Sequence, residues 1–428
     1  MSDRVSGALS PYQKFVAVIL AFLQFTVVLD FMILSPLGAQ LMPALHISAV
    51  QFGLLLSTYA FSAGLSGILT AGFADRVDRK KLLLCCYTGL LAGTLLCGLA
   101  SSYHALVFGR LIAGLFAGVV GSTSLAIVAD VFPLAMRGRV MGITQTAFAA
   151  SSVLGTPFGL LLSNQWRWNA PFLMIVAVGI PVGVLIKVRL HPVDAHLKWH
   201  RDRSPLHHLI QTLSNGYYLQ GFATTALLSV GGFMLMPFMS AFTVHNVGVP
   251  ISRLPLVYVL VGSVSVVTGP LIGRASDNHG KFNVFCFGCA VAIPMVVLYT
   301  HLTVTPLWIF ICVLAVLQVS IFSRNISASA LMSALPVPAD RGAYMSISSS
   351  LQQMAGGVGA VLSGMMVIQH EDGLLLHLDR VGYVLVGTTL LTLLIVYFIN
   401  RKIVAAELAA TRSPRDIGAS SPGLSRSN

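Results

Sequence analysis

One aspartate stands inside the first long apolar run of the sequence. The run begins near Phe15, and its segment TVVLDFMILSP (26–36) contains Asp30. Burying a carboxylate in such a run costs several kcal/mol unless a partner compensates it. Of the 14 acidic residues in the chain, Asp30 alone lies well inside an apolar run. It is therefore the first candidate for chemistry.

Arg110, in the run LVFGRLIAGLFAGVVGS (106–122), is a candidate partner for Asp30. At about 1.5 Å per helical residue, Asp30 lies roughly 24 Å into its helix and Arg110 roughly 7 Å below the opposite membrane face. In a core of about 30 Å the two side chains are then at similar height. Pairing would keep Asp30 ionised, and loss of the pair would favour its protonation. Two interpretations stay open: proton or substrate coupling, and a structural ion pair that locks two helices.

Charged residues also gather in the short loop AGFADRVDRKKLLL (71–84), which holds two acids and four bases. Asp75 could cap the following helix or bind Arg79. Asp130 ends another apolar run, and Arg137 follows it. Such a network could form in one arrangement of the helices and break in another. The alternative is that the bases only set the orientation of the chain in the membrane.

These residues belong to a chain of membrane-protein composition. Of its 428 residues, 56% are hydrophobic and 9% charged, against about 25% charged in an ordinary soluble domain. Runs of about 20 apolar residues, each long enough to span the bilayer as a helix, are predicted at 14–36, 50–71, 82–102, 105–130, 140–163, 170–189, 215–241, 254–274, 282–301, 306–330, 343–368 and 380–400.

The net charge of +12 follows membrane topology and gives no indication of a nucleic-acid partner. If the N-terminus lies inside, all but five of the 26 lysines and arginines fall in inner segments. The exceptions are Arg110 and Arg324 within spans, and Arg167, Arg253 and Arg380 in outer connections. This positive-inside bias predicts that both termini are cytoplasmic.

The chain also repeats itself. DFMILSP (30–36) resembles GFMLMP (232–237), DRVDRK (75–80) resembles DNHGK (277–281), and FPLAMRG (132–138) resembles LPVPADRG (335–342). The landmarks keep their order at an offset of about 203 residues, which indicates two homologous six-span halves. We expect one bundle over 1–190, a cytoplasmic linker over 191–213, a second bundle over 214–405 and a disordered cytoplasmic tail over 406–428.

The loop 71–84 and its counterpart GRASDNHGK (273–281) resemble the paired cytoplasmic loops of the major facilitator superfamily. The family pattern is Gly-x-x-x-Asp-Arg-x-Gly-Arg-Lys. The matching positions are Asp75, Arg76, Arg79 and Lys80 in the first copy, and Gly273, Asp277, Gly280 and Lys281 in the second. The resemblance covers about 14–400. It implies an all-α membrane protein with twelve transmembrane helices in two pseudo-symmetric six-helix bundles, the major facilitator fold.

By the same resemblance, the loop acid, the loop arginine and the acid that ends span 4 form a cytoplasmic latch; here these are Asp75, Arg79 and Asp130. Arg137 and Arg341 complete the expected gate. Spans 1, 4, 7 and 10 line the central cavity of the family. We therefore expect the coupling or substrate residues to be Asp30, Arg110, Gln24, Arg324 and Asn325. For Arg324, an anionic substrate and a backbone carbonyl are equally open as partners.

Two segments resemble the drug:proton antiporter branch of this family. Arg110–Gly114 follows the Arg-x-x-Gln-Gly pattern of span 4, with Ala113 in place of glutamine. SSVLGTPFG (151–159) resembles the span 5 signature, with Gly155, Pro157 and Gly159 in register. Glycine and proline there would allow close packing and a bend. An export direction is associated with that signature.

The predicted function is secondary active transport: proton-coupled efflux of small organic compounds or drugs by alternating access. The alternative is a proton symporter that takes up sugars or organic acids. A membrane-embedded enzyme is disfavoured, because the sequence has no HExxH, no GxxxxGK[ST] and no Ser/His/Asp group at one depth. We expect no cofactor or metal, a small-molecule substrate, protons and the lipid bilayer as partners, and a monomer in the bacterial inner membrane.

Overall fold

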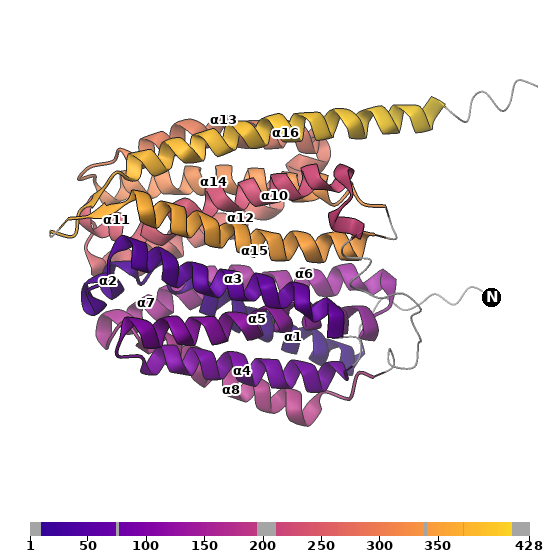
Figure 1. Cartoon of the computed structure of the whole chain (residues 1–428), viewed down its shortest axis with the longest axis horizontal. Helices are drawn as coiled ribbons and strands as arrows, with labels where there is room; N and C mark the ends of the chain where they lie inside the picture. The colour runs from indigo at the N-terminus through magenta and orange to yellow at the C-terminus, as the bar shows by residue number, and fades with distance from the viewer. Residues whose placement is uncertain (1–9, 74–76, 195–210, 338–339, 371, 413–428) are drawn as a thin grey trace, which may run out of the picture.

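The computed structural model describes residues 10–73, 77–194, 211–337, 340–370 and 372–412. Helices dominate this part of the chain, and eleven of them are long and apolar enough to span a membrane. The molecule is two layers of roughly parallel long helices, one from each half of the sequence (Figure 1). The predicted all-α membrane fold is therefore confirmed.

The N-terminal bundle contains the first six predicted spans. Its elements are α1 (Pro11–Met32), α2 (Gly38–Leu45), α3 (Ala49–Phe73), α4 (Arg79–Leu99), α5 (Tyr103–Val131), α6 (Leu134–Ala150), the π-helical turn η2 (Ser151–Gly155), α7 (Thr156–Gln165) and α8 (Ala170–Arg189). Side-chain caps fix several helix starts, since Ser10, Asp78 and Ser102 each accept a hydrogen bond from a first-turn N–H group.

The C-terminal bundle contains the other six. Its elements are α10 (Gly216–Leu235), η4 (Met236–Phe238), α11 (Met239–His245), η5 (Ile251–Arg253), α12 (Leu254–His279), α13 (Lys281–Thr300), α14 (Leu307–Met332), α15 (Arg341–Met366), the hairpin strands β1 (Ile368–Gln369) and β2 (Leu375–Leu376), and α16 (Leu378–Arg412). In the hairpin, Ile368 pairs with Leu376 and Gln369 with Leu375. α15 has 26 residues but is too rich in serine and glycine to count among the eleven apolar spans.

Three predicted spans are interrupted. The span 14–36 ends at Met32, and a separate helix α2 follows a turn that contains Pro36. The span 215–241 narrows to a 3-10 turn at Met236–Phe238, where Pro237 lacks the N–H group that an α-helix needs. The span 140–163 contains the π-helical turn Ser151–Gly155. These interruptions divide long apolar runs that look continuous in the sequence.

The predicted limits of the last bundle need one correction. α16 continues to Arg412, past the expected end of the span at 400 and of the bundle at 405. The extension contains Ala406, Leu408, Ala409 and Ala410, which have high helix propensity. Residues 195–210 of the predicted linker and 413–428 of the predicted tail lie outside the described part of the chain.

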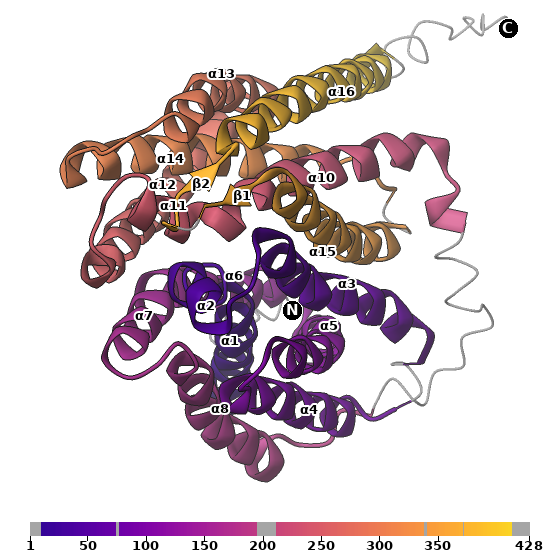
Figure 2. The same cartoon turned by 60° about the vertical axis from the view of Figure 1, so that its left-hand side comes forward.

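The two bundles meet on two sides, and a smaller contact joins α2 to α11 at one end. α3 packs against α15, and α12 packs against η2 and α7. Along the first contact the backbones come very close, because a Cβ atom on Gly53 would lie 2.5 Å from the carbonyl oxygen of Ala360. Glycine is required at such a crossing of helices. In Figure 2, α15 of one layer faces α3 of the other layer.

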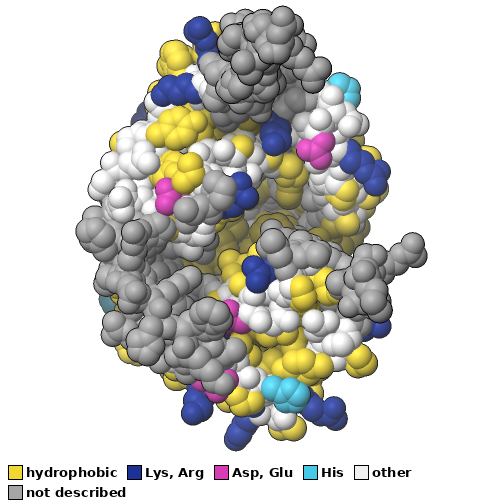
Figure 3. Space-filling view, turned by 90° about the vertical axis from the view of Figure 1, so that its right-hand side faces the viewer, with side chains coloured by type: hydrophobic (Ala, Val, Ile, Leu, Met, Phe, Trp, Pro, Cys, Tyr) yellow, Lys and Arg dark blue, Asp and Glu magenta, His cyan; other side chains and the backbone are white. Residues whose placement is uncertain are grey.

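The ends of the molecule differ in how the bundles join. We call the end with α2, α11 and the hairpin the hairpin face, and the end where α1 starts and α16 ends the termini face (Figure 1). One apolar core joins both bundles in the half toward the hairpin face, including Leu34, Phe52, Phe238 and Phe310. Toward the termini face each bundle has a core of its own. Figure 3 looks onto the termini face and shows a hollow with hydrophobic walls between the bundles.

Candidate functional site

The structure brings Asp30 and Arg110 together inside the N-terminal bundle. The Arg110 Nη1 atom lies 3.3 Å from Asp30 Oδ2 and donates a hydrogen bond to the Asp30 main-chain carbonyl oxygen at 2.8 Å. The Asp30 side chain is 0% exposed and the Arg110 side chain is 1% exposed. The ion pair thus lies wholly inside the protein, where it is not screened by water.

The geometry at Asp30 follows from the end of α1. The carbonyl groups in the last turn of a helix have no partner further along that helix. The Asp30 carbonyl is one of these, two residues before the final Met32, and Arg110 supplies its hydrogen bond. Arg110 therefore neutralises the carboxylate and also caps the C-terminal end of α1.

Two further side chains complete this network, and sequence reasoning missed both. Thr94 of α4 donates a hydrogen bond from Oγ1 to Asp30 Oδ1 at 3.0 Å. The ring of Tyr59 of α3 lies 4.1 Å from the guanidinium carbon of Arg110, in a cation–π contact. A lone threonine or tyrosine in an apolar run carries no sign of which helix it faces. The four residues come from four different helices, α1, α3, α4 and α5.

The network lies next to the boundary between the bundles. Phe31 follows Asp30, and its ring contacts both Tyr59, at 5.4 Å between centroids, and Phe233 of α10, at 5.6 Å. Gln24 is half-buried seven residues before Phe31, so it shares the Phe31 face of α1 and lies toward the termini face. The single side chain of Phe31 therefore connects the Asp30 network to the C-terminal bundle.

Arg324 and Asn325 of α14 lie in the C-terminal bundle, apart from this pair. Both line a cavity of about 20 Å³ with residues of α10 and α16, among them Gly232 and Leu385. Arg324 is 6% exposed. Within the described residues its Nε atom has no hydrogen-bond partner, and its guanidinium interacts with the Cys289 thiol of α13 rather than with a carboxylate. The backbone-carbonyl alternative for Arg324 therefore finds no support in this part of the chain.

At the termini face, the structure joins Arg79 to Asp130. The Arg79 Nε atom lies 3.2 Å from Asp130 Oδ2. Arg137 donates hydrogen bonds to the carbonyl oxygens of Ala129 and Phe132, which end α5. These contacts connect α4, α5 and α6 within one bundle. Asp75 and Arg76 lie outside the described residues, and Lys80 is half-buried in the first turn of α4.

The second copy of the loop forms a tight turn between α12 and α13. Gly280 has φ of +90°, a conformation that side chains disfavour, which explains glycine there. Asp277 is exposed and Lys281 half-buried at this turn, and Arg341 is exposed at the first residue of α15. Gly273, on α12, has open space where a Cβ atom would be. Among the described residues no hydrogen bond or ion pair joins this copy to the first.

The span 5 residues lie against α1. A Cβ atom on Gly155 would be 2.8 Å from a Leu29 methyl group, and one on Gly159 would be 2.7 Å from Ile33. Pro157 lies just after the π-helical turn, where the helix continues from η2 into α7, and it supplies no N–H donor at this point. The π-helical turn and these glycines bring span 5 close to the last turn of α1, which carries Asp30.

Comparison with known proteins identifies the family. The Major Facilitator Superfamily model matches residues 20–360 and 221–421, and the chain belongs to this family. Over 347 residues it is 25% identical to the uncharacterized MFS-type transporter YceJ of Bacillus subtilis (strain 168), covering 80% of this chain and 86% of YceJ. It is 34% identical over 159 residues to the vacuolar membrane amino acid uptake transporter fnx2 of Schizosaccharomyces pombe, covering 37% of this chain and 26% of fnx2.

Solved structures agree in fold. A bacterial homologue of the human lysosomal transporter Spinster, inward-facing and occupied, superposes with a TM-score of 0.74 at 16% identity, over 92% of this chain and 98% of that one. The nucleoside transporter NupG superposes with a TM-score of 0.71 at 14% identity, over 90% of this chain and 99% of the NupG chain. The protein is thus a polytopic membrane protein and a secondary transporter of the major facilitator type.

Proposed function

We propose that this protein is a proton-coupled exporter of small organic compounds, and that it has no enzymatic activity. It would work as a monomer by alternating access in a bacterial inner membrane. The observation that carries the proposal is the buried network of Asp30, Arg110, Thr94 and Tyr59. An intramembrane acid is costly, and such residues commonly mark proton pathways.

The chemistry of the pair suits coupling to one proton. Ionised Asp30 is neutralised by Arg110 in the conformation described, with the hollow open at the termini face. Protonation would remove the carboxylate charge and weaken the bond between α1 and α5. Since α1 borders the C-terminal bundle through Phe31, this change would favour a different arrangement of the two bundles.

The orientation and direction of transport are part of the proposal. Lys80, Arg137, Lys281 and Lys402 all lie toward the termini face, so the positive-inside bias supports placing that face in the cytoplasm. Export is supported by the likeness of residues 151–159 to the span 5 signature of drug:proton antiporters. The Arg79–Asp130 pair would form part of a cytoplasmic latch with Asp75.

Uptake of organic acids is the second candidate, and Arg324 is the observation that favours it. A buried guanidinium that has a thiol but no carboxylate as partner among the described residues would attract a carboxylate substrate. The relative fnx2 is described as an amino acid uptake transporter. Under this alternative, substrate and proton would move in the same direction.

The test is proton movement in proteoliposomes that contain a pH-sensitive dye. Cationic drugs, sugars and organic anions are added in turn to wild type and to Asp30→Asn. We expect one class of compound to move protons with wild type and none to do so with the variant. Export predicts proton movement opposite to the substrate, and symport predicts movement with it.

A matched variant separates coupling from a structural lock. Asp30→Asn leaves the Arg110 charge without its acid, which costs about 3–5 kcal/mol at a buried pair. The double variant Asp30→Asn/Arg110→Gln removes both charges, so it should recover part of the lost thermal stability while remaining uncoupled. Wild-type proton movement by either stable variant would show that the pair is only structural.

A further inference from the structure

A groove opens between α10 and α16 near the termini face. We call it the α10–α16 groove; its volume is about 440 Å³, and its lining residues are Gly216, Leu219, Gln220, Ala223, Ile395, Phe398 and Lys402. The two helices diverge toward this end of the molecule (Figures 1 and 2). Its volume falls within the range of about 300–1,000 Å³ that is usual for small-molecule sites.

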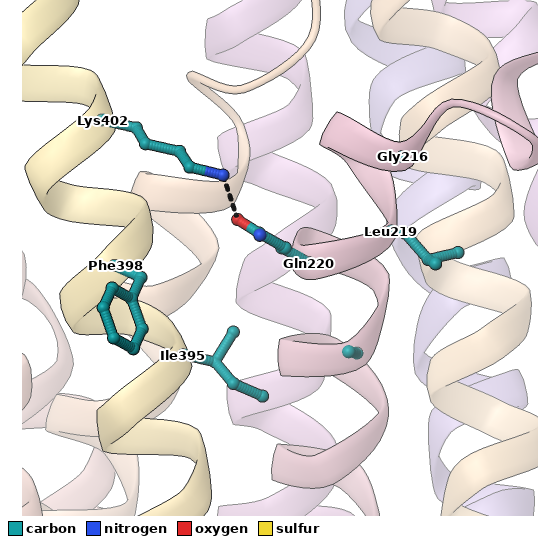
Figure 4. A pocket seen from close by; sticks show the side chains of 7 residues that line it. Gly216, Leu219, Gln220, Ile395, Phe398 and Lys402 are labelled. Atoms are coloured by element: carbon teal, nitrogen blue, oxygen red, sulfur yellow. Dashed lines mark hydrogen bonds between the residues drawn. The ribbon is translucent and has the colours of Figure 1, made fainter.

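The groove is polar at one end and apolar at the other. Lys402 reaches across from α16, and its Nζ atom donates a hydrogen bond to Gln220 Oε1 of α10 at 3.1 Å (Figure 4). Further from the helix ends, Ala223, Ile395 and Phe398 form an apolar wall. Among the described residues that line the groove, none is acidic. An occupant should therefore combine an anionic head with a hydrocarbon chain.

The position of the groove agrees with such an occupant. Leu219 and Phe398 are 57% and 48% exposed on the outer side of a membrane-spanning bundle, where the acyl chains of lipids lie. Arg401 and Lys402 follow directly on the apolar run of α16, which would place Lys402 at the depth of the headgroups. Lysine at this depth can keep its ammonium group at the interface while its stem contacts apolar surface.

We infer that the α10–α16 groove binds one anionic phospholipid, with its phosphate at Lys402 and an acyl chain along Ala223, Ile395 and Phe398. Basic pockets between transmembrane helices favour anionic headgroups. The phosphate would take the free donors of Lys402, which has three, one of them used by Gln220. The lipid would connect the first span of the C-terminal bundle to the last, whatever compound the protein transports.

The test is native mass spectrometry of the purified full chain with phosphatidylglycerol or phosphatidylcholine of identical acyl chains. We expect phosphatidylglycerol to bind about fivefold more tightly, the ratio given by one lysine at the membrane surface. Lys402→Gln should abolish that preference. Arg401→Gln is the matched control, because it removes one charge at the same depth from a residue that does not line the groove and lies over Tyr397.

Two further arms make the test decisive. Ala223→Phe should weaken binding of both lipids, because the ring fills the apolar part of the groove. Inorganic phosphate should not displace phosphatidylglycerol, because it lacks the chain. The inference is overturned if the two lipids bind equally, if Lys402→Gln and Arg401→Gln have the same effect, or if phosphate displaces the lipid. Thermal unfolding of each variant shows that it is folded.

Discussion

Arg110 is held by three different contacts, and only one of them depends on the charge state of Asp30. The carboxylate contact at 3.3 Å would weaken on protonation. The hydrogen bond to the Asp30 carbonyl and the stacking on Tyr59 would remain. Under the proposed function, Arg110 therefore keeps its place while the acid takes up and releases a proton. This arrangement avoids the cost of an unpaired buried charge, because a displaced guanidinium would be left without partners in the bundle.

At this scale we predict that the ring of Tyr59 matters and its hydroxyl does not. The Tyr59 hydroxyl is buried without a hydrogen-bond partner among the described residues, so Tyr59→Phe should leave thermal stability unchanged. Tyr59→Leu removes the cation–π contact, which contributes about 2 kcal/mol or more where it is desolvated. Thermal unfolding in detergent measures both. Equal destabilisation by the two variants would show that the hydroxyl contributes.

The charged half of the site could be predicted from the sequence, and the neutral half could not. Asp30 and Arg110 are unusual because charge in an apolar run is costly, and helical rise alone places them at one depth. Thr94 and Tyr59 are common residues of apolar helices, so their roles depend on tertiary packing. The paired partners Arg79 and Asp130 were likewise visible as charges. The roles proposed for all these residues in transport remain predictions.

Among the elements, α15 shows how packing replaces hydrophobicity. It carries Gly356, Gly357, Gly359 and Gly364, and it packs mainly against α3 and α10. Small residues allow these helices to approach closely, and dispersion and backbone contacts then hold them. The sequence predicted this helix and its eleven companions, but not the breaks at Pro36 and Pro237 or the π-helical turn. The prolines remove backbone N–H donors, and the π-helical turn lies against α1 of its own bundle, where Ser151 donates a hydrogen bond to the Phe25 carbonyl oxygen.

We predict that Gly53→Val destabilises the contact between α3 and α15. The new side chain would collide with the Ala360 backbone, which cannot give way as a flexible side chain can. Overpacking of this kind costs about 1–3 kcal/mol, and thermal unfolding measures it. Gly121→Ala in α5 is the control, because its Cβ atom would meet open space; it should leave stability equal or slightly higher. Wild-type stability of Gly53→Val would show that the two helices can separate without cost.

On the scale of the whole molecule, the two repeats meet each other at the hairpin face. The Ser35 hydroxyl donates a hydrogen bond to the Met236 carbonyl oxygen, and the Ser240 hydroxyl donates one to the Ser35 carbonyl oxygen at 2.9 Å. These residues belong to or adjoin DFMILSP and GFMLMP, the first pair of repeated segments. Repetition was visible in the sequence, but a contact between the copies was not, because homology says nothing about proximity. The shared core beneath them closes this face.

We predict that a disulfide at this contact stops transport. Ser35→Cys/Ser240→Cys, in a background with the exposed Cys85 and Cys312 replaced by serine, should cross-link under mild oxidation. Alternating access requires the hairpin face to open, so the cross-linked protein should lose flux and regain it on reduction. Each single cysteine variant is a control that should transport normally in both conditions. Undiminished flux through the cross-linked protein would refute opening at this contact.

The polarity of α15 has a consequence for the synthesis of the protein. A translocon admits a helix to the lipid according to its apolarity, and α15 falls below the level that the other eleven spans reach. Its partner α3 is made almost 300 residues earlier and α10 more than 100, so both are already in the bilayer when α15 emerges. Insertion of α15 should therefore be assisted by the helices that will pack against it. The chain from α15 onward would then acquire its topology from the part already built, and a mutation in α3 could misplace a helix of the other bundle.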